Sequence, residues 1–264
     1  MLRTYKYLLR PNNEQLNSLD FLLWQSMLVY NAALEQRITT YQETGKGIGY
    51  GSQWARFRDI RRNNPDTLGL VNASSLQHLL RRLDKSFAAF FRRLKSGEKP
   101  GFPRFKSRNR FSSIEYTYGD GCKLRMNEHG RMSFYIQNVG EMRMCYHRAI
   151  PEEANIKHVI IKRYSERWYV FLMIELPNSE KRIEQTGKQV GIDVGLKTLA
   201  ALSTGELIEN PRWLRESLAK LRKLQRHASR QIKGSNRQKK TYRKIARLHE
   251  EISNQRADYL HKIS

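Results

Sequence analysis

The chain has 264 residues and carries 49 Lys and Arg against 25 Asp and Glu, which gives a formal net charge of +24 at neutral pH. This length allows one large domain or two smaller ones, each with a hydrophobic core. So large a positive excess favours a polyanionic partner, most simply nucleic acid. No apolar run approaches the roughly 20 residues of a membrane-spanning helix, and no signal-peptide core follows the first residues. We therefore expect a soluble cytoplasmic protein with no membrane partner.

The cysteines and histidines give no metal motif. Cys122 and Cys145 are the only two cysteines and form no C-x-x-C pair. This argues against a disulfide framework and against a complete structural zinc site in this chain. The seven histidines are scattered along the sequence, and we assign none of them as a ligand.

The N-terminal part predicts one strand and three helices. Residues 2–10 alternate as in a β-strand, and apolar residues from 14 to 43 recur at helical spacing. Four glycines between 45 and 51 then break this helix and place Tyr50 in a flexible turn. A short basic helix is expected over 52–62, and a third helix follows, with Asn72 or Ser74 as its cap.

The third helix and the loop after it are strongly basic. Between residues 76 and 110 there are eleven Lys and Arg but only two acidic residues, and the loop from 97 to 106 interleaves aromatic rings with cations. This mixture can stack on bases while it neutralises phosphates, whereas the alternative is an ordinary solvated surface. The residues expected to bind nucleic acid here are Arg81, Arg82, Lys85, Arg92, Arg93, Lys95, Arg104, Phe105 and Lys106.

Strands dominate from about 111 to 177. Six short runs, separated by Gly, Asn or Pro turns, should join residues 2–10 in a small antiparallel barrel interrupted by the helical insertion at 14–95. Residues 178–188 are polar and read as a linker.

The stretch from Val190 to Ala201 places one carboxylate, Asp193, within a run of aliphatic residues. It suits a central strand that turns back into a hairpin at 203–206. A buried carboxylate needs a cation or a charged partner, because leaving it unpaired costs several kcal/mol. The alternative is an edge-strand Asp that faces water.

The last part predicts a basic helical hairpin. Two helical repeats lie on either side of a Gly-Ser-Asn break at 234–236, and residues 211–264 hold 16 Lys and Arg against 4 Asp and Glu. We expect the pair of helices to clamp phosphates. The cations expected to do so are Lys220, Arg222, Lys223, Arg226, Lys239 and Lys240.

Several of these segments together resemble the TnpB family of insertion-sequence-encoded proteins, which are relatives of the compact type V CRISPR effectors. The matching segments, in the family's order, are R-P-N-N-E-Q, V-Y-N-A-A-L at 29–34, G-K-G-I-G-Y at 45–50, G-F-P-R-F-K at 101–106, G-I-D-V-G-L-K at 191–197 and R-A-D-Y-L-H-K-I at 256–263.

The resemblance implies a multidomain α+β fold. Residues 1–10 and 97–180 would form a wedge β-barrel, and 11–96 a helical recognition domain inserted in it. Residues 189–264 would begin a RuvC-like nuclease domain of RNase H type, carrying the basic helical hairpin.

The resemblance also implies an activity. A guide RNA would pair with double-stranded target DNA, while the protein reads a short motif beside the target. Tyr50, Gln77, Thr117 and Tyr118 match positions at the motif duplex, although Ala73 stands where a basic contact is expected. Asp193 matches the first of three acidic ligands for two Mg²⁺ ions, which would activate water and stabilise the leaving oxygen.

The family's other two acids, and its zinc ribbon, follow beyond the segments present here. One carboxylate cannot hold two Mg²⁺ ions, so we expect these 264 residues alone not to cut DNA. The chain would then be part of a longer RNA-guided endonuclease. The alternative is a nuclease-inactive RNA-guided DNA binder that acts as a repressor. A DNA-strand transferase ranks last, because no nucleophilic Tyr with paired His ligands is evident.

Overall fold

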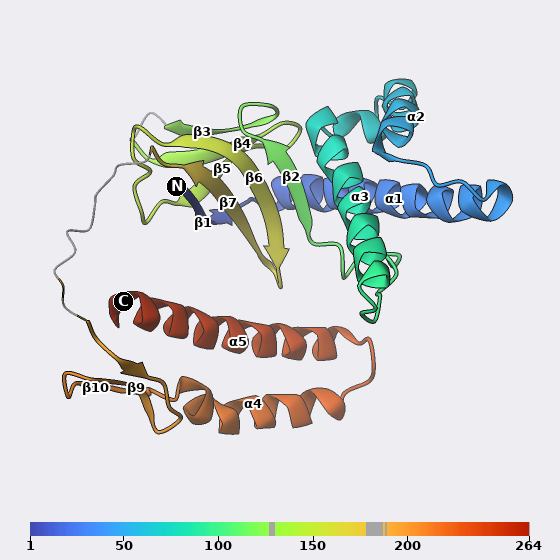
Figure 1. Cartoon of the computed structure of the whole chain (residues 1–264). Helices are drawn as coiled ribbons and strands as arrows, with labels where there is room; N and C mark the ends of the chain where they lie inside the picture. Colours follow the sequence, from blue (N-terminus) through green and yellow to red (C-terminus); the bar gives the residue numbers. More distant parts are fainter. Residues whose placement is uncertain (127–129, 178–186, 188, 264) are drawn as a thin grey trace. The chain divides into compact units, whose positions relative to one another are not determined.

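A computed structural model describes residues 1–126, 130–177, 187 and 189–263, and contacts divide the chain into two compact units, 1–179 and 180–264 (Figure 1). The first unit contains a large sheet with helices, and the second contains a small sheet with a helical hairpin. The expected linker at 178–188 lies almost wholly outside the described residues. The expected separation of the first unit into wedge and recognition domains stays a prediction.

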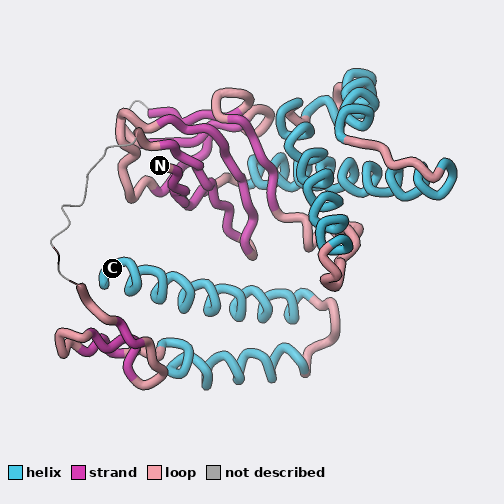
Figure 2. Tube along the Cα trace, in the orientation of Figure 1, coloured by secondary structure: helices cyan, strands magenta, loops and turns pink. Residues whose placement is uncertain are grey.

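Seven strands build the antiparallel sheet of the first unit (Figure 2). They pair in the order β2-β6-β7-β1-β5-β4-β3, so the N-terminal strand lies at the centre of the sheet. Their bounds are β1 (Leu2–Arg10), β2 (Ser113–Thr117), β3 (Cys122–Met126), β4 (Met132–Ile136), β5 (Gly140–Cys145), β6 (Asn155–Tyr164) and β7 (Arg167–Glu175). The strand expected at residues 2–10 and the six strands expected between about 111 and 177 are all present.

The strands expected to form a barrel are present, but the sheet is not closed, because β2 and β3 remain the two edges of a curled sheet. These strands follow one another in sequence through the tight turn 118–121, where the Gly119 N–H donates to Cys122 O at 3.0 Å. Beyond the turn, the described backbone shows no ladder between them. Closing a barrel requires every strand to pair on both sides, and this sheet stops short of that.

Three helices follow β1 and precede β2. They are α1 (Asn13–Thr44), α2 (Tyr50–Asn63) and α3 (Ala73–Lys95), with a short 3₁₀ turn, η1 (Leu68–Leu70), before α3. Asn12 and Gln15 form a reciprocal capping box at the start of α1, and Gly45 ends it in the left-handed conformation that glycine adopts without strain. Asn72, rather than Ser74, caps α3 by accepting from the N–H groups of Ser74 and Ser75.

The second helix begins earlier than expected, at Tyr50, so this residue is not part of a flexible turn. Gly49 has an extended backbone at the N-cap. The ring of Tyr50 packs partly buried against the main core, and the guanidinium of Arg81 lies 5.1 Å from its centroid. Packing of this ring explains why the helix extends to Tyr50 despite the surrounding glycines.

One continuous core joins the sheet to the helices. Its buried side chains come from all three helices and from every strand of the large sheet, with Cys122 as the contribution of β3. Trp168, Tyr7, Tyr116 and Phe134 are among its largest fully buried side chains. Polar contacts add to this packing: buried Arg37 donates from Nε to Gln53 Oε1 at 2.7 Å and from Nη2 to Asp84 Oδ1 at 2.8 Å. This network ties α1, α2 and α3 together.

The second unit has a three-stranded antiparallel sheet, ordered β10-β9-β8, and two helices. The strands are β8 (Ile192–Asp193), β9 (Thr198–Leu202) and β10 (Leu207–Glu209), and the helices are α4 (Trp213–Ser229) and α5 (Asn236–Ile263). The expected β-hairpin at 203–206 and the helical hairpin are both confirmed. Leu221, Ala228, Ile245, Leu248 and Ile252 form the buried seam between α4 and α5.

Among the described residues, no helix combines the length and the apolar character that crossing a membrane requires.

Candidate nucleic-acid interface

The residues expected to face a DNA motif lie around the first half of α3. Gln77 and Arg81 are one helical turn apart and so share a face of α3. Tyr50 lies beneath Arg81, and Thr117, at the end of β2, is exposed beside α3, with its Oγ1 3.1 Å from His78 Nε2. The structure therefore brings Tyr50, Gln77 and Thr117 to one region of the first unit.

Tyr118 differs from these three residues. Its ring packs partly buried against the core, and its hydroxyl accepts from the Leu124 N–H at 3.3 Å. The hydroxyl therefore stabilises the turn between β2 and β3. Its role in binding a DNA motif stays a prediction.

A second surface forms where α3 ends and the following loop folds back on it. Phe102 packs edge-on against Phe87 and Phe90, with ring centroids 5.6 and 5.3 Å apart. Further along, Asn31 of α1 donates to Lys106 O at 2.9 Å and accepts from Lys106 N at 2.8 Å. The loop is thus fixed at both of these points.

These anchors leave aromatic rings and several cations of the loop and helix end in solvent. Phe105 is 54% exposed, and Phe91 on α3 is 52% exposed. Within the part of the chain that the structure describes, the side chains of Arg92, Arg93 and Lys95 form no ion pair. We call this surface the α3-end surface; it comprises Phe91, Arg92, Arg93, Lys95, Arg104 and Phe105. Phe91 is the member that the sequence did not single out.

Arg82 has a different environment from the other cations of α3. It lies 4.9 Å over the ring of Phe111, donates to Ser113 Oγ at 3.2 Å and approaches Glu115 Oε1 at 3.7 Å. Burial lowers the pKa of its guanidinium, with Glu115 opposing the effect. Arg82 therefore links α3 to the sheet, whereas Arg81 and Lys85 are exposed.

The helical hairpin of the second unit presents the remaining predicted cations to solvent. Lys220, Arg222, Lys223 and Arg226 on α4 are exposed, as are Lys239 and Lys240 near the start of α5. At the other end of α5, Tyr259 packs edge-on against Trp213 at 5.3 Å and donates to Glu209 O at 2.8 Å. This contact anchors the hairpin to β10.

Asp193 is exposed at the end of the two-residue edge strand β8, which agrees with the alternative of an edge-strand Asp facing water and not with a buried acid in a central strand. The reason is that, in the described backbone, β8 has β9 as its one partner, opposite Ala201 and Leu202. Gly195, just after it, allows a close backbone approach, since a Cβ there would lie 3.1 Å from Thr198 O.

Two Mg²⁺ ions need several oxygen ligands in one place. Among the described residues, Asp193 belongs to no group of three or more His, Cys, Asp or Glu side chains that could share a metal ion. Binding of Mg²⁺ at Asp193 therefore stays a prediction.

Replacing Asp193 with Ala in this chain is expected to change the free energy of unfolding by less than about 0.5 kcal/mol, because substitutions of exposed surface residues usually have small effects. RNA affinity should not change either. Denaturant unfolding and RNA titration check both, with Glu206→Ala on the exposed turn as the matched control. A loss well above that of the control would mean that Asp193 has a structural partner.

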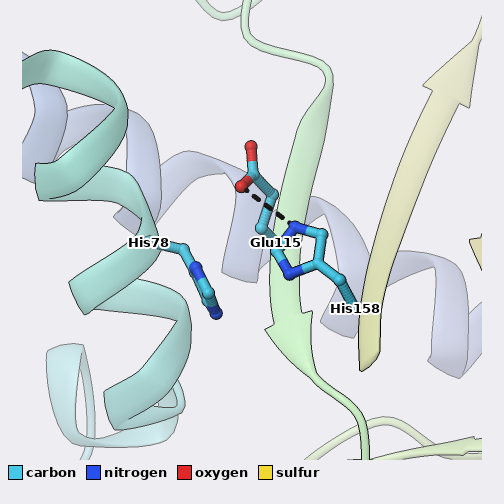
Figure 3. A group of neighbouring side chains, drawn as sticks. All are labelled: His78, Glu115 and His158. Atoms are coloured by element: carbon cyan, nitrogen blue, oxygen red, sulfur yellow. Dashed lines mark ion pairs between the residues drawn. The ribbon is translucent and has the colours of Figure 1, made fainter. Parts of the chain in front are cut away.

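The structure brings together one polar cluster that the sequence did not reveal. His78 of α3, Glu115 of β2 and His158 of β6 point toward one another, with ligand atoms all within 4.8 Å (Figure 3). Burial lowers the pKa of His78, and the adjacent His158 adds to this shift. These residues are far apart in sequence. The pairing of Thr117 with His158 brings Glu115 and His158 together, and the packing of α3 against β2 adds His78. No spacing motif could have found them.

Comparison with known proteins identifies the chain's relatives. Residues 171–264 match the family model OrfB_IS605, described as a probable transposase, and residues 1–46 match the model described as its helix-turn-helix domain. Over 99% of its length, the chain is 34% identical to a Streptomyces pristinaespiralis protein with the provisional name RNA-guided DNA endonuclease. The chain is a homologue of the IS605 OrfB (TnpB) proteins.

A second relative, from Escherichia coli K12, is 31% identical over the whole chain and has the provisional name RNA-guided DNA endonuclease InsQ. The chain spans 63% and 62% of the lengths of these two proteins. In the segment matched to the helix-turn-helix model, the structure shows strand β1 followed by the single long helix α1. Among solved structures, a CRISPR-Cas12f ternary complex matches with a TM-score of 0.40 and 16% identity, over 94% of this chain and 59% of that one. A likeness at this level supports no conclusion.

Proposed function

We propose that this chain is the nucleic-acid-binding part of an RNA-guided DNA endonuclease, which holds a guide RNA and recognises a short motif beside the DNA target. The observation that carries the proposal is the similarity over 99–100% of the chain to two relatives named for that activity. The net charge of +24 suits two polyanionic partners at once.

The surfaces described above suggest a division of roles. The α3-end surface combines exposed cations with rings that can stack on unpaired bases, which suits single-stranded or looped RNA. The helical hairpin carries exposed Lys and Arg with few acidic residues, which suits a phosphate backbone. The region of Tyr50, Gln77 and Thr117 carries polar side chains that can reach base edges, so we assign motif reading to it.

We also propose that these 264 residues bind DNA without cutting it. Asp193 is the residue assigned to the nuclease site, and within the described part of the chain it belongs to no group of three or more His, Cys, Asp or Glu side chains that could share a metal ion. This same observation favours the second candidate function, a nuclease-inactive RNA-guided binder that represses by occupying DNA. The two functions differ only in what a longer version of the protein would do to its target.

The first test is whether the chain selects RNA. When it is expressed together with the transcript of its own gene region, the purified chain should retain one RNA species protected from ribonuclease. A variant with Lys220, Arg222, Lys223 and Arg226 changed to Gln should protect less of that species. If the chain instead retains RNA of mixed sequence, and high salt removes all of it, then the chain binds polyanions in general and does not select an RNA.

A further inference from the structure

The cluster of His78, Glu115 and His158 arises from the register of two strands and one helix. Ile114 and Tyr116 of β2 are buried in the core, so Glu115, between them, points to the opposite face. Thr117 pairs directly with His158 of β6, which places His158 diagonally across from Glu115 on that face. His78 comes from α3, which packs against β2 (Figure 3).

We propose that His78, Glu115 and His158 bind one divalent transition-metal ion of the zinc type. Two imidazoles and a carboxylate are a ligand set that Zn²⁺ takes in proteins, with water completing four-coordination. A hard cation such as Mg²⁺ prefers oxygen ligands and near-octahedral geometry, so it does not suit this set. The proposal does not depend on the proposed function.

The distances fit such an ion with little movement. Ligands about 2.0–2.1 Å from a tetrahedral zinc ion lie about 3.3 Å from one another. His158 Nε2 and Glu115 Oε2 are already 3.3 Å apart. All three ligand atoms lie within 4.8 Å of one another. His78 is half-buried, and closing the remaining gap requires its side chain to rotate toward the other two ligands.

The two oxygens of Glu115 have separate partners. Oε2 faces His158, whereas Oε1 is 3.7 Å from Arg82 Nη1. As an ion-pair partner, Arg82 therefore orients the carboxylate without occupying the oxygen that would bind the ion, a role that outer groups have around metal sites. Thr117 Oγ1, 3.1 Å from His78 Nε2, restrains the imidazole of His78 in the same way.

The surrounding charge sets the strength of the site. Arg81, Arg82 and Lys85 lie near the cluster and oppose a cation, and Glu115 is the only carboxylate among its three ligands. We therefore expect weaker binding than at a closed site with four protein ligands. A bound ion would join α3 to β2 and β6 beside Gln77 and Thr117, and so fix the region assigned to motif reading.

The test is a titration of the whole chain with Co²⁺, whose visible absorption reports coordination, followed by displacement with Zn²⁺. We expect one equivalent of Co²⁺ with bands typical of four- or five-coordination, and no response to Mg²⁺. Zn²⁺ at about 100 times its dissociation constant should raise the melting temperature by roughly 5–10 °C. His78→Asn and Glu115→Gln should each abolish the bands and this rise.

His249→Asn, which changes an exposed histidine on α5, is the matched control and should leave the stoichiometry and the bands unchanged. Circular dichroism of each metal-free variant shows whether it is folded. Two results would overturn the proposal. One is the absence of saturable Co²⁺ binding by the unchanged chain. The other is binding that persists at full strength in folded Glu115→Gln, which retains the shape of the side chain but not its charge.

Discussion

Replacing Arg92, Arg93 and Lys95 together with Gln should make RNA binding distinctly less dependent on salt. Each phosphate contact that is lost lowers the slope of log K against log salt by about 0.7–0.9, so the triple variant should lose about 2–3 units of slope. All three cations belong to the α3-end surface, and within the described residues none of them forms an ion pair that would occupy it. Filter-binding titrations over a range of salt concentrations measure the slope.

The matched control removes equal charge from the strands of the sheet, through Arg3→Gln, Lys123→Gln and Arg143→Gln, all at exposed positions. A general loss of positive charge would change both triple variants alike. A specific phosphate-binding surface at the end of α3 predicts a larger change for the first triple variant. Equal slopes in the two triple variants would mean that Arg92, Arg93 and Lys95 are ordinary solvated surface residues.

Replacing Arg37 with Met should lower the free energy of unfolding of the first unit by about 3 kcal/mol. The guanidinium is only 7% exposed, yet it donates to Gln53 and Asp84 and lies 5.0 Å over the ring of Phe87. Hydrogen bonds to charged groups contribute about 1.5–3 kcal/mol each, and a buried acceptor left without a donor costs about 1–3 kcal/mol. Gln53 Oε1 becomes such an acceptor, because Gln53 is fully buried.

Guanidinium chloride unfolding measures this loss. Arg58→Met is the matched control, because Arg58 pairs with Asp59 at 3.3 Å in solvent, and exposed ion pairs contribute only about 0–1 kcal/mol. Similar midpoints for the two variants would mean that Arg37 contributes no more to stability than a surface arginine.

The secondary structure of the first unit was largely predictable because its signals are local. Helix α1 follows from apolar residues at helical spacing and from the Asn12–Gln15 capping box, both of which lie in adjacent sequence. The strands follow from alternation between turns. The missing closure of the sheet was not predictable, because the pairing of its edges depends on strand twist and register rather than on any local residue.

The environment of Asp193 shows the same limit. The apolar residues around it predicted a buried central strand, yet Ile192 is 61% and Val194 is 73% exposed. Sequence shows that a segment suits a strand, but not which strands lie on either side of it. In the described part of the chain β8 has one neighbour, β9, and so it forms an edge.

The candidate sites divide in the same way. Charge runs predicted the exposed cations of α3 and the helical hairpin, because Lys and Arg side chains are rarely buried and a run of them therefore indicates a surface. The sequence did not show that Phe102 packs edge-on against Phe87 of α3, although this ring is still 46% exposed and that of Phe105 is 54% exposed. The group of His78, Glu115 and His158 required the strand register and the position of α3.

The central claim is that this chain binds DNA under the direction of a guide RNA and does not cut it. The most direct measurement mixes the chain, assembled with a defined guide RNA, with matched and mismatched target duplexes in Mg²⁺, and follows both binding and strand integrity. We predict binding of the matched duplex alone, with both of its strands intact. Cut strands, or equal binding of the two duplexes, would contradict the claim.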